Sequence, residues 1–294
     1  MPDAVTQVGL TLQPEREYCE RLEPLFLEEA DYFEVTPETT WVRDGAEAFR
    51  PNGFWRLFRE LGDRTGKPFV AHGVGLSLGT FGDDRARLDR WLEAIRNSQE
   101  AFGFLWYTDH LGPTLLDGRA VTIPVALPMT EEAAAAVRRR LEAVQEIVPD
   151  VGFENSAFYY LLGKPLDEPG FFARILERPR THLLLDLHNL YTNAVNLGFD
   201  AEAYLDRLDL SRVIEIHVSG GSLSEAGWLP SKRVMRLDSH DAPVPEEVWG
   251  LLERTLPRCP NLRGVTLERM EGTVGEGDLP LLREELRRVR RAIG

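Results

Sequence analysis

The sequence has few of the residues that mark secreted or membrane proteins. Only two cysteines occur, Cys19 and Cys259, and neither stands in a C-x-x-C pair, which excludes a disulfide framework. No apolar run approaches the roughly 18 residues that a membrane span requires. The first residues, MPDAVTQVGLTLQPE, show neither the basic nor the apolar region of a signal peptide. We therefore expect a cytoplasmic protein with no membrane association.

Basic residues are scarce relative to acidic ones. The chain has 34 lysines and arginines against 48 aspartates and glutamates, a formal net charge of −14 and a pI near 5.0. Such a surface repels the phosphates of nucleic acids, so general nucleic-acid binding is excluded. With 43% hydrophobic and 28% charged residues, the composition is that of a globular protein.

Short apolar runs alternate with segments of 3.6-residue periodicity along all 294 residues. The runs are Val8–Leu12, Tyr32–Val35, Phe69–Ala71, Phe104–Tyr107, Val151–Phe153, Leu183–Leu185, Val213–Val218 and Gly264–Leu267. Eight strands alternating with helices predict an α/β fold, a (β/α)8 TIM barrel in a single domain covering residues 1–294. A doubly wound open sheet is the main alternative, but no glycine-rich turn follows the first run.

The helical segments and two long connections complete this outline. The clearest helices are Arg85–Phe102, Glu131–Val148, Gly170–Glu177, Ala201–Leu208, Pro245–Leu256 and Leu281–Ile293, with Thr130 as the expected N-cap of the second. The segments 111–128 and 219–241 are too long for simple connections, and long loops in compact domains are usually functional. Because both follow a strand, we expect both at the C-terminal rim of the barrel.

Ionisable residues stand where six consecutive strands end. They are His72, His110, Glu154, Asp186, His217 and Glu268, and Asp238 and His240 follow in the loop after the seventh strand. Any one of them alone is more often a structural residue or a helix cap. In a barrel, however, these ends converge on one rim, where active sites lie.

Such a set indicates bound metal. Four carboxylates on a rim without lysine or arginine at the same positions would repel one another unless cations were bound. Imidazoles mixed with carboxylates, and no thiolate, are ligands for iron, manganese or zinc. We predict two or three divalent ions, with Glu154, Asp186 and His240 acting in catalysis as well as in binding.

Residues near these strand ends extend the hypothesis. Asp238 and His240 can chelate one ion together, although Asp-Ser-His-Asp is also turn chemistry. His188 or Asn189 could complete a third metal site. His182 begins the sixth strand at the opposite end of the barrel, so we expect a structural role there.

Weaker patterns indicate substrate contacts. Ser219 and Gly220 belong to a Ser-Gly-Gly-Ser segment that could form a nest of amides for an anion, or only a flexible turn. Tyr159 could line the pocket, although aromatic packing under a loop is commoner. His188 is a further candidate for substrate binding.

Several motifs resemble one known family in order and spacing. They are HGVGLSLG at 72–79, DHL at 109–111, LPMTEEA at 127–133, EN at 154–155, LDLHNLY at 185–191, NLGFD at 196–200, IH at 216–217 and DSHD at 238–241. They resemble the TIM-barrel family that contains the multinuclear iron enzymes of methanobactin and thiaglutamate biosynthesis. More distantly, the order of ligands is similar to that of endonuclease IV and the xylose isomerase-like barrels.

The resemblance implies a function. Members hold two or three irons on the barrel rim and use dioxygen to oxidise a cysteine of a ribosomally made peptide, which a partner protein often delivers. The family's ligand positions match those predicted above, with Glu154 as a bridge and Asn189 in a third site. Three positions depart from the family: Asn usually stands at His188, a tyrosine-bearing segment around Met129, and Glu-Trp at Glu268-Arg269.

Other functions stay open at this point. A metal-dependent sugar isomerase or epimerase would use similar carboxylates, but usually also a lysine or histidine that moves protons, and no lysine ends a strand here. A phosphodiesterase of the endonuclease IV type shares the ligand order, but the net charge of −14 does not favour a DNA substrate. A catalytically silent metal-binding protein is the alternative outside enzymology.

Overall fold

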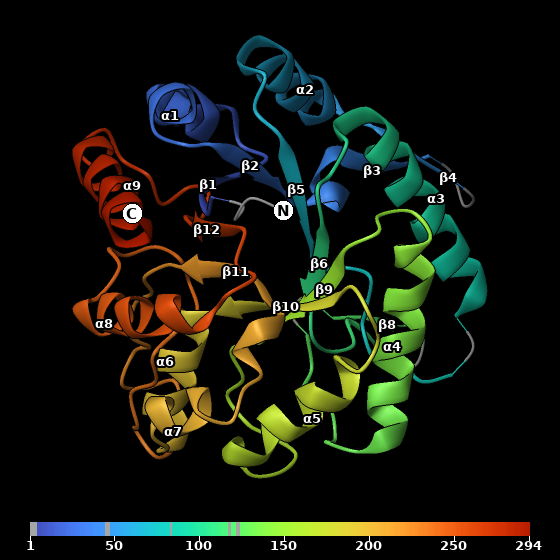
Figure 1. Cartoon of the computed structure of the whole chain (residues 1–294), viewed down its shortest axis with the longest axis vertical. Coiled ribbons are helices and arrows are strands. Elements are labelled where there is room, and N and C mark those ends of the chain that lie inside the picture. Colours follow the sequence, from blue (N-terminus) through green and yellow to red (C-terminus); the bar gives the residue numbers. More distant parts are fainter. Residues whose placement is uncertain (1–4, 45–47, 83, 117–118, 122–123) are drawn as a thin grey trace.

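Eight parallel strands close into a barrel in the computed structural model, which describes residues 5–44, 48–82, 84–116, 119–121 and 124–294 (Figure 1). The strands are β1 (Gln7–Leu12), β2 (Tyr32–Val35), β5 (Phe69–Gly73), β6 (Tyr107–His110), β9 (Val151–Glu154), β10 (Thr181–Asp186), β11 (Val213–Val218) and β12 (Gly264–Leu267). Their order around the barrel is β1-β12-β11-β10-β9-β6-β5-β2. This confirms the predicted (β/α)8 TIM barrel.

Helices surround the barrel on its outer side (Figure 1). They are α1 (Arg16–Glu28), α2 (Gly53–Thr65), α3 (Arg85–Phe102), α4 (Glu131–Gln145), α5 (Glu168–Ile175), α6 (Leu187–Leu197), α7 (Ala201–Leu205), α8 (Glu246–Thr255) and α9 (Leu279–Ile293). The hydroxyl of Thr130 accepts from the amide of Ala133, as its predicted role of N-cap of α4 requires. Across the described residues, the structure contains no helix long and apolar enough to cross a membrane.

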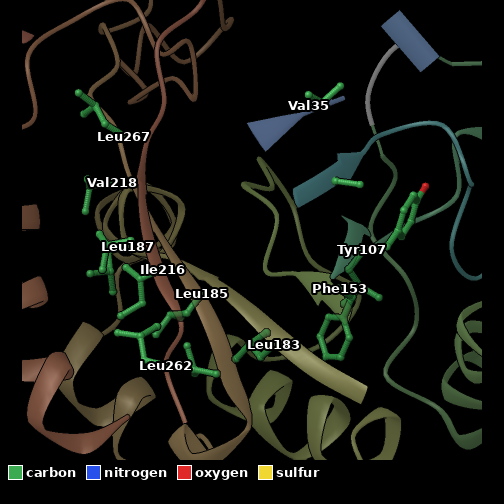
Figure 2. Packing of buried hydrophobic residues seen from close by; sticks show 14 of the residues in the cluster. Val35, Tyr107, Phe153, Leu183, Leu185, Leu187, Ile216, Val218, Leu262 and Leu267 are labelled. Carbon is green, nitrogen blue, oxygen red and sulfur yellow. The ribbon is translucent and has the colours of Figure 1, made fainter. Parts of the chain in front are cut away.

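The strands form because most of their side chains are apolar on both faces, as parallel sheets covered by helices require. All residues of β11 are buried, and so are five of the six in β10. Leu183, Leu185 and Ile216 belong to the core between barrel and helices (Figure 2). The parallel register sets Asp186 opposite His217, so side chains at neighbouring strand ends share one rim.

Several predicted boundaries differ from the observed ones by a few residues, and some observed helices were not predicted. The regular part of the fourth strand begins at Tyr107 instead of Phe104, although the carbonyl of Trp106 already accepts from the amide of Ala71. Helices α1, α2 and α6 were not among the expected segments, and α6 begins directly after β10 with Asp186 as its N-cap. The start of the fourth strand lies away from the rim, whereas the start of α6 lies at the rim.

Connections after the strands carry short additional elements. The loop after β2 contains a 3-10 turn (Pro37–Thr40) and the hairpin β3 (Trp41–Asp44) with β4 (Ala48–Pro51), which the sequence pattern did not predict. The loop after β6 contains the small hairpin β7 (Leu115–Leu116) with β8 (Arg119–Ala120). Residues 117–118 and 122–123 of the expected rim loop 111–128 lie outside the described residues.

The opposite end of the barrel is held by an ion cluster. Asp150 contacts Nε2 of His182 at 3.1 Å, Nε of Arg180 at 3.0 Å and a guanidinium nitrogen of Arg263 at 3.0 Å. Burial opposes ionisation of Asp150, but the bonds to His182 and the two arginines hold its pKa well below its usual value. The position and partners of His182 agree with the structural role expected for it.

Glu168, the first residue of α5, should make stability depend on pH. Burial raises the pKa of this carboxyl from 4.5 to about 7, against the lowering effect of the Tyr204 hydroxyl, which donates to it at 2.5 Å. The folded protein therefore holds a proton that the unfolded chain has released, and this stabilisation is lost as the pH rises from about 4.5 to 7. The loss is on the order of 3 kcal/mol. Relative to wild type, Glu168→Gln should become more stable across that range in urea unfolding, and a difference that does not change with pH would contradict this.

Candidate metal centre

The predicted ligands meet at the carboxyl ends of the strands. Several sets of three place one possible ligand atom from each residue within 4.8 Å of the others. Four of these sets are His72 with His110 and Glu154, His72 with His217 and Glu268, Glu154 with Asp186 and His217, and His188 with Asp238 and His240. The first three share members and are called the inner group, and the last is called the outer group.

Glu154 joins two imidazoles of the inner group. Its Oε2 lies 3.4 Å from Nε2 of His72 and 3.1 Å from Nε2 of His110. Two ligand atoms on one ion lie about 3 to 3.5 Å apart when each is about 2.1 Å from the metal. The spacing therefore fits an ion that Glu154 shares with the two histidines, and the position of Glu154 between neighbouring sets suits the bridge predicted for it.

Glu268 connects the inner group to the outer group. Its Oε2 lies 3.1 Å from Nδ1 of His217 and 3.6 Å from Nε2 of His240. In the outer group, Oδ1 of Asp238 lies 2.6 Å from Nε2 of His240 and 3.5 Å from Nδ1 of His188. The candidate ligands thus form one continuous cluster of nitrogen and oxygen atoms.

Eight buried polar atoms of this cluster have no hydrogen-bond partner within the described part of the chain. They are Nε2 of His72 and His240, Nδ1 of His188 and His217, Oε2 of Glu154, Oδ2 of Asp186, and Oδ1 of Asn189 and Asp238. Buried polar atoms are normally satisfied, and each orphan costs about 1–3 kcal/mol. Atoms of this kind that converge on one place are those that divalent cations satisfy, so the residues fit a multinuclear metal centre.

Outer hydrogen bonds fix which nitrogen of each imidazole faces the site. The hydroxyl of Thr108 donates to the carbonyl of Ala71 at 3.3 Å and therefore accepts from Nδ1 of His72 at 2.9 Å. Nδ1 of His110 donates to the carbonyl of Gly73 at 3.1 Å. In both rings the proton is on Nδ1, so an unprotonated Nε2 with a free lone pair faces the site. Metal-bound histidines have the same arrangement.

Two buried carboxylates behind the site did not emerge from the sequence. Nε2 of His217 donates to Glu34 at 2.8 Å, which leaves Nδ1 free for a metal. Glu215 accepts from Tyr32 at 2.8 Å and from Trp106 at 2.7 Å, so its oxygens are already satisfied. A charged residue inside an apolar strand, such as Glu34 in β2, is the signal that could have revealed this support.

Helix α6 organises the rim through residues on one side of its first turns. The carboxylate of Asp186 caps the helix by accepting from the amide of Asn189 at 2.7 Å. Nδ2 of Asn189 donates to Glu154 at 3.0 Å and to the carbonyl of Asn155 at 3.2 Å, so its Oδ1 is left for the site. Asn155 bonds both backbone groups of Asp186. These hydrogen bonds therefore hold Glu154, Asp186 and Asn189 together at the rim.

The ionisation of the cluster shows the cost of crowding these groups. Burial and the charges of Glu154, Asp238 and Glu268 raise the pKa of Asp186 far above its ordinary value. Burial alone would lower the pKa of His72, but contact with Glu154 raises it to about 9. In the absence of cations, the raised pKa values of Asp186 and His72 keep both groups protonated. Metal binding must therefore release protons.

The candidates for substrate contact have different surroundings. Tyr159 lies at the rim, and its hydroxyl accepts from the amide of Asp238 at 3.4 Å. His188 is fully buried and belongs to the outer group of ligands. Ser219 and Gly220 are buried, and a side chain at Gly220 would overlap the carbonyls of residues 242 and 243. At Gly220 the lack of a side chain admits a neighbouring loop.

Neither cysteine belongs to the cluster. Cys19 is half-buried in α1, Cys259 is buried after α8, and both are free thiols. Burial raises the pKa of each to about 12, which keeps both protonated at neutral pH. A thiol in the chemistry of this site must therefore come from another molecule.

The fold and the site define the class: a TIM barrel with a cluster of imidazoles and carboxylates suited to metal on its C-terminal rim. The family model described as "RiPP precursor modification enzyme MbnB/TglH/ChrH" matches residues 7–293, so the chain belongs to this family of enzymes. The resemblance found in the sequence motifs is thereby confirmed. A UPF0276 protein of Pseudomonas aeruginosa strain UCBPP-PA14 is 34% identical over 241 residues, 81% of this chain and 77% of that protein. One from Caulobacter vibrioides is 31% identical over 85% of this chain and 82% of its own.

Solved structures of low identity share the fold. A xylose isomerase domain protein from Alicyclobacillus acidocaldarius superposes with a TM-score of 0.59 at 17% identity, covering 98% of this chain and 99% of that one. Endonuclease IV from Thermus thermophilus gives a TM-score of 0.55 at 16% identity, covering 95% of this chain and 98% of that one. These likenesses show that the chain shares the fold of the xylose isomerase-like barrels, as the sequence predicted.

Proposed function

We propose that the protein is a multinuclear, iron-dependent enzyme that uses dioxygen to oxidise a cysteine of a peptide. Zinc or manganese would satisfy the same ligands, but neither supplies electrons to dioxygen as readily as ferrous iron. The observation that carries the proposal is the convergence of eight unpartnered buried ligand atoms on one rim, in a chain that belongs to a family of peptide-modifying enzymes. The peptide substrate, and a partner protein that delivers it, come from the resemblance.

The chain's own residues prepare the reaction. A multinuclear iron centre, when bound, supplies a Lewis acid for a thiolate and electrons for dioxygen. Glu154, His72 and His110 would hold one position, and Glu154, Asp186 and His217 a neighbouring one. Glu34 and Thr108 orient their histidines, and both are buried, so the ligands are fixed before substrate arrives.

The redox balance is simple. Each pair of electrons and protons removed from the cysteine residue passes to dioxygen, which leaves as hydrogen peroxide after two electrons or as two waters after four. The thiol comes from the peptide because Cys19 and Cys259 lie outside the cluster. An exposed fraction of 20% for the His110 side chain and 21% for that of Asp238 leaves two edges of the cluster open to a substrate.

Oxygen uptake with a cysteine peptide tests this proposal. The protein is loaded anaerobically with Fe²⁺ and mixed with a short synthetic peptide that contains one cysteine, and with a Cys→Ser version of it. Oxygen uptake and a change in mass of the cysteine-bearing fragment are expected only with the cysteine peptide. An iron-loaded protein that leaves both peptides unchanged, or instead epimerises a ketose or cleaves abasic DNA, would refute it.

A further inference from the structure

We propose that the arm formed by residues 222–237, in the loop after β11, binds the segment of the substrate peptide that flanks its cysteine, and that this segment carries acidic and apolar side chains. The inference rests on the proposed function, because it gives the peptide of that reaction a place on this chain. The arm combines exposed apolar side chains, positive charge and an open backbone edge beside the candidate metal ligands.

Large apolar side chains of the arm are exposed to solvent. Trp228 is 60% exposed, Leu223 59% and Val234 43%. Trp228 is the exposed one among the six tryptophans of the chain, since the other five are buried or half-buried. Exposed apolar side chains gathered on one element are typical of a surface that binds another molecule, and tryptophan contributes more to such binding than most residues.

The arm is held in place by the body of the protein. Its two halves pair through Leu223 and Arg236, and the amide of Ser224 donates to the carbonyl of Met235 at 2.8 Å. The side chain of Asn196, in α6, bonds the amide and the carbonyl of Arg236, each at 2.9 Å. The exposed side chains therefore stand on a fixed backbone, which lowers the entropic cost of binding.

One edge of the arm is open to an additional strand. Leu223 and Arg236 are opposite each other without bonding to each other, so the backbone groups of both point outward. Those of Arg236 are bonded by Asn196, whereas the amide and the carbonyl of Leu223 have no hydrogen-bond partner in the described residues. An extended peptide that aligns beside Leu223 can supply this partner, as in other cases where a peptide extends a sheet edge.

The arm is positively charged in a chain whose net charge is −14. Between residues 222 and 237 it has three basic residues, Lys232, Arg233 and Arg236, and a single acidic one, Glu225. Nε of Arg236 is buried and has no hydrogen-bond partner within the described part of the chain. Carboxylates are attracted here and repelled by the net charge of the rest of the protein. Charge complementarity therefore favours an acidic segment of the peptide.

The position of the arm determines which part of the peptide it can reach. Val234 precedes the candidate ligand Asp238 by four residues, which span at most about 13 Å when extended. With the cysteine at the metal centre, peptide residues within about four positions of it can lie along the arm. The bound segment is therefore the immediate neighbourhood of the cysteine.

Binding of synthetic peptides to the full chain, loaded anaerobically with Fe²⁺, tests the inference. Each labelled peptide has serine in place of cysteine, so that no oxidation occurs, and next to it phenylalanine with glutamate, with glutamine or with lysine. Fluorescence anisotropy should show the tightest binding for the glutamate peptide, and about 3-fold weaker binding for the glutamine peptide. Trp228→Ala should weaken binding of the glutamate peptide by about 10-fold or more.

Lys232→Asn tests the charge of the arm. Asn tolerates the φ of 57° at this position, so the backbone is kept. We expect about 3-fold weaker binding of the glutamate peptide and a smaller dependence of binding on salt concentration. The lysine peptide should not lose affinity in this variant.

Leu27→Ala and Arg64→Gln are the matched controls. Leu27 is 43% exposed near the end of α1, and Arg64 lies in the last turn of α2, so both are at the end of the barrel opposite to the rim. Both variants should bind the peptides as wild type does. Metal content and Tm should be equal in all four variants, which separates loss of binding from a folding defect.

Tryptophan emission adds a direct readout. The glutamate peptide should shift the emission to shorter wavelength in wild type and not in Trp228→Phe. Equal affinities for the glutamate and lysine peptides, or unchanged binding by Trp228→Ala, would overturn the docking surface while the proposed function stands. The predicted binding in a protein that oxidises no cysteine peptide would refute the proposed function and support the arm as a site for acidic peptides.

Discussion

Replacing Glu154 with glutamine should remove at least one metal ion per chain and abolish oxidation of the substrate. Oε2 of Glu154 faces Nε2 of both His72 and His110, at 3.4 and 3.1 Å. A glutamine at this position is neutral and places an NH2 group, a hydrogen-bond donor, near Nε2 of His72 and His110. It therefore cannot bridge cations as a carboxylate does. Mutation of a residue that hydrogen-bonds to a metal ligand typically lowers metal affinity 10–100-fold. Mutation of a ligand shared by two ions should therefore lower metal affinity by more than about 100-fold.

Glu168→Gln is the matched control for this variant. Glu168 is also a buried glutamate, 6% exposed, but its partner is the Tyr204 hydroxyl, and it belongs to none of the ligand sets named above. Metal content should be measured by mass spectrometry on both variants after identical iron loading. If Glu154→Gln keeps the metal content and turnover of wild type, Glu154 is no ligand and the inner group does not work as described.

Removal of metal should lower the thermal stability markedly. Without cations the centre buries four carboxylates, and burial together with the neighbouring negative charges raises the pKa of Asp186 far above its normal value. Ions bound at a free concentration a thousand times their dissociation constant stabilise the native state by about 4 kcal/mol. For a chain of this size that corresponds to a fall in Tm on the order of 10 °C.

Differential scanning fluorimetry before and after chelation measures this effect. Re-addition of Fe²⁺ under anaerobic conditions should restore the Tm, and Glu154→Gln should show a smaller shift than wild type. An unchanged Tm in protein from which metal analysis shows all ions removed would mean that the cluster is stable without cations.

The barrel and the meeting of most candidate ligands on one rim could be predicted because both follow from local patterns. A strand of a parallel barrel is apolar throughout, so a His, Asp or Glu at its end, such as His72 or Glu154, is conspicuous. The topology then brings these ends to one rim without knowledge of any contact. His217 and Glu268 are found in the same way, at the ends of β11 and β12.

Other features could not be predicted, because they depend on which side chains face each other. Glu34 lies within β2 and is 183 residues from His217, so their hydrogen bond needs the closed barrel. Gly220 and Gly221 suggest a flexible turn in the sequence, whereas in the structure they admit the backbone of residues 237–243. The place of His188 in the outer group likewise requires the approach of that loop.

The metal content of protein loaded anaerobically with iron tests the central claim most directly. Mass spectrometry counts all metals per chain, and Mössbauer spectroscopy shows whether the irons occupy different positions. We predict two or three irons per chain in distinguishable environments. Less than one iron per chain, with zinc or manganese bound in full, would contradict an iron enzyme, and less than one ion of any kind would contradict the metal centre itself.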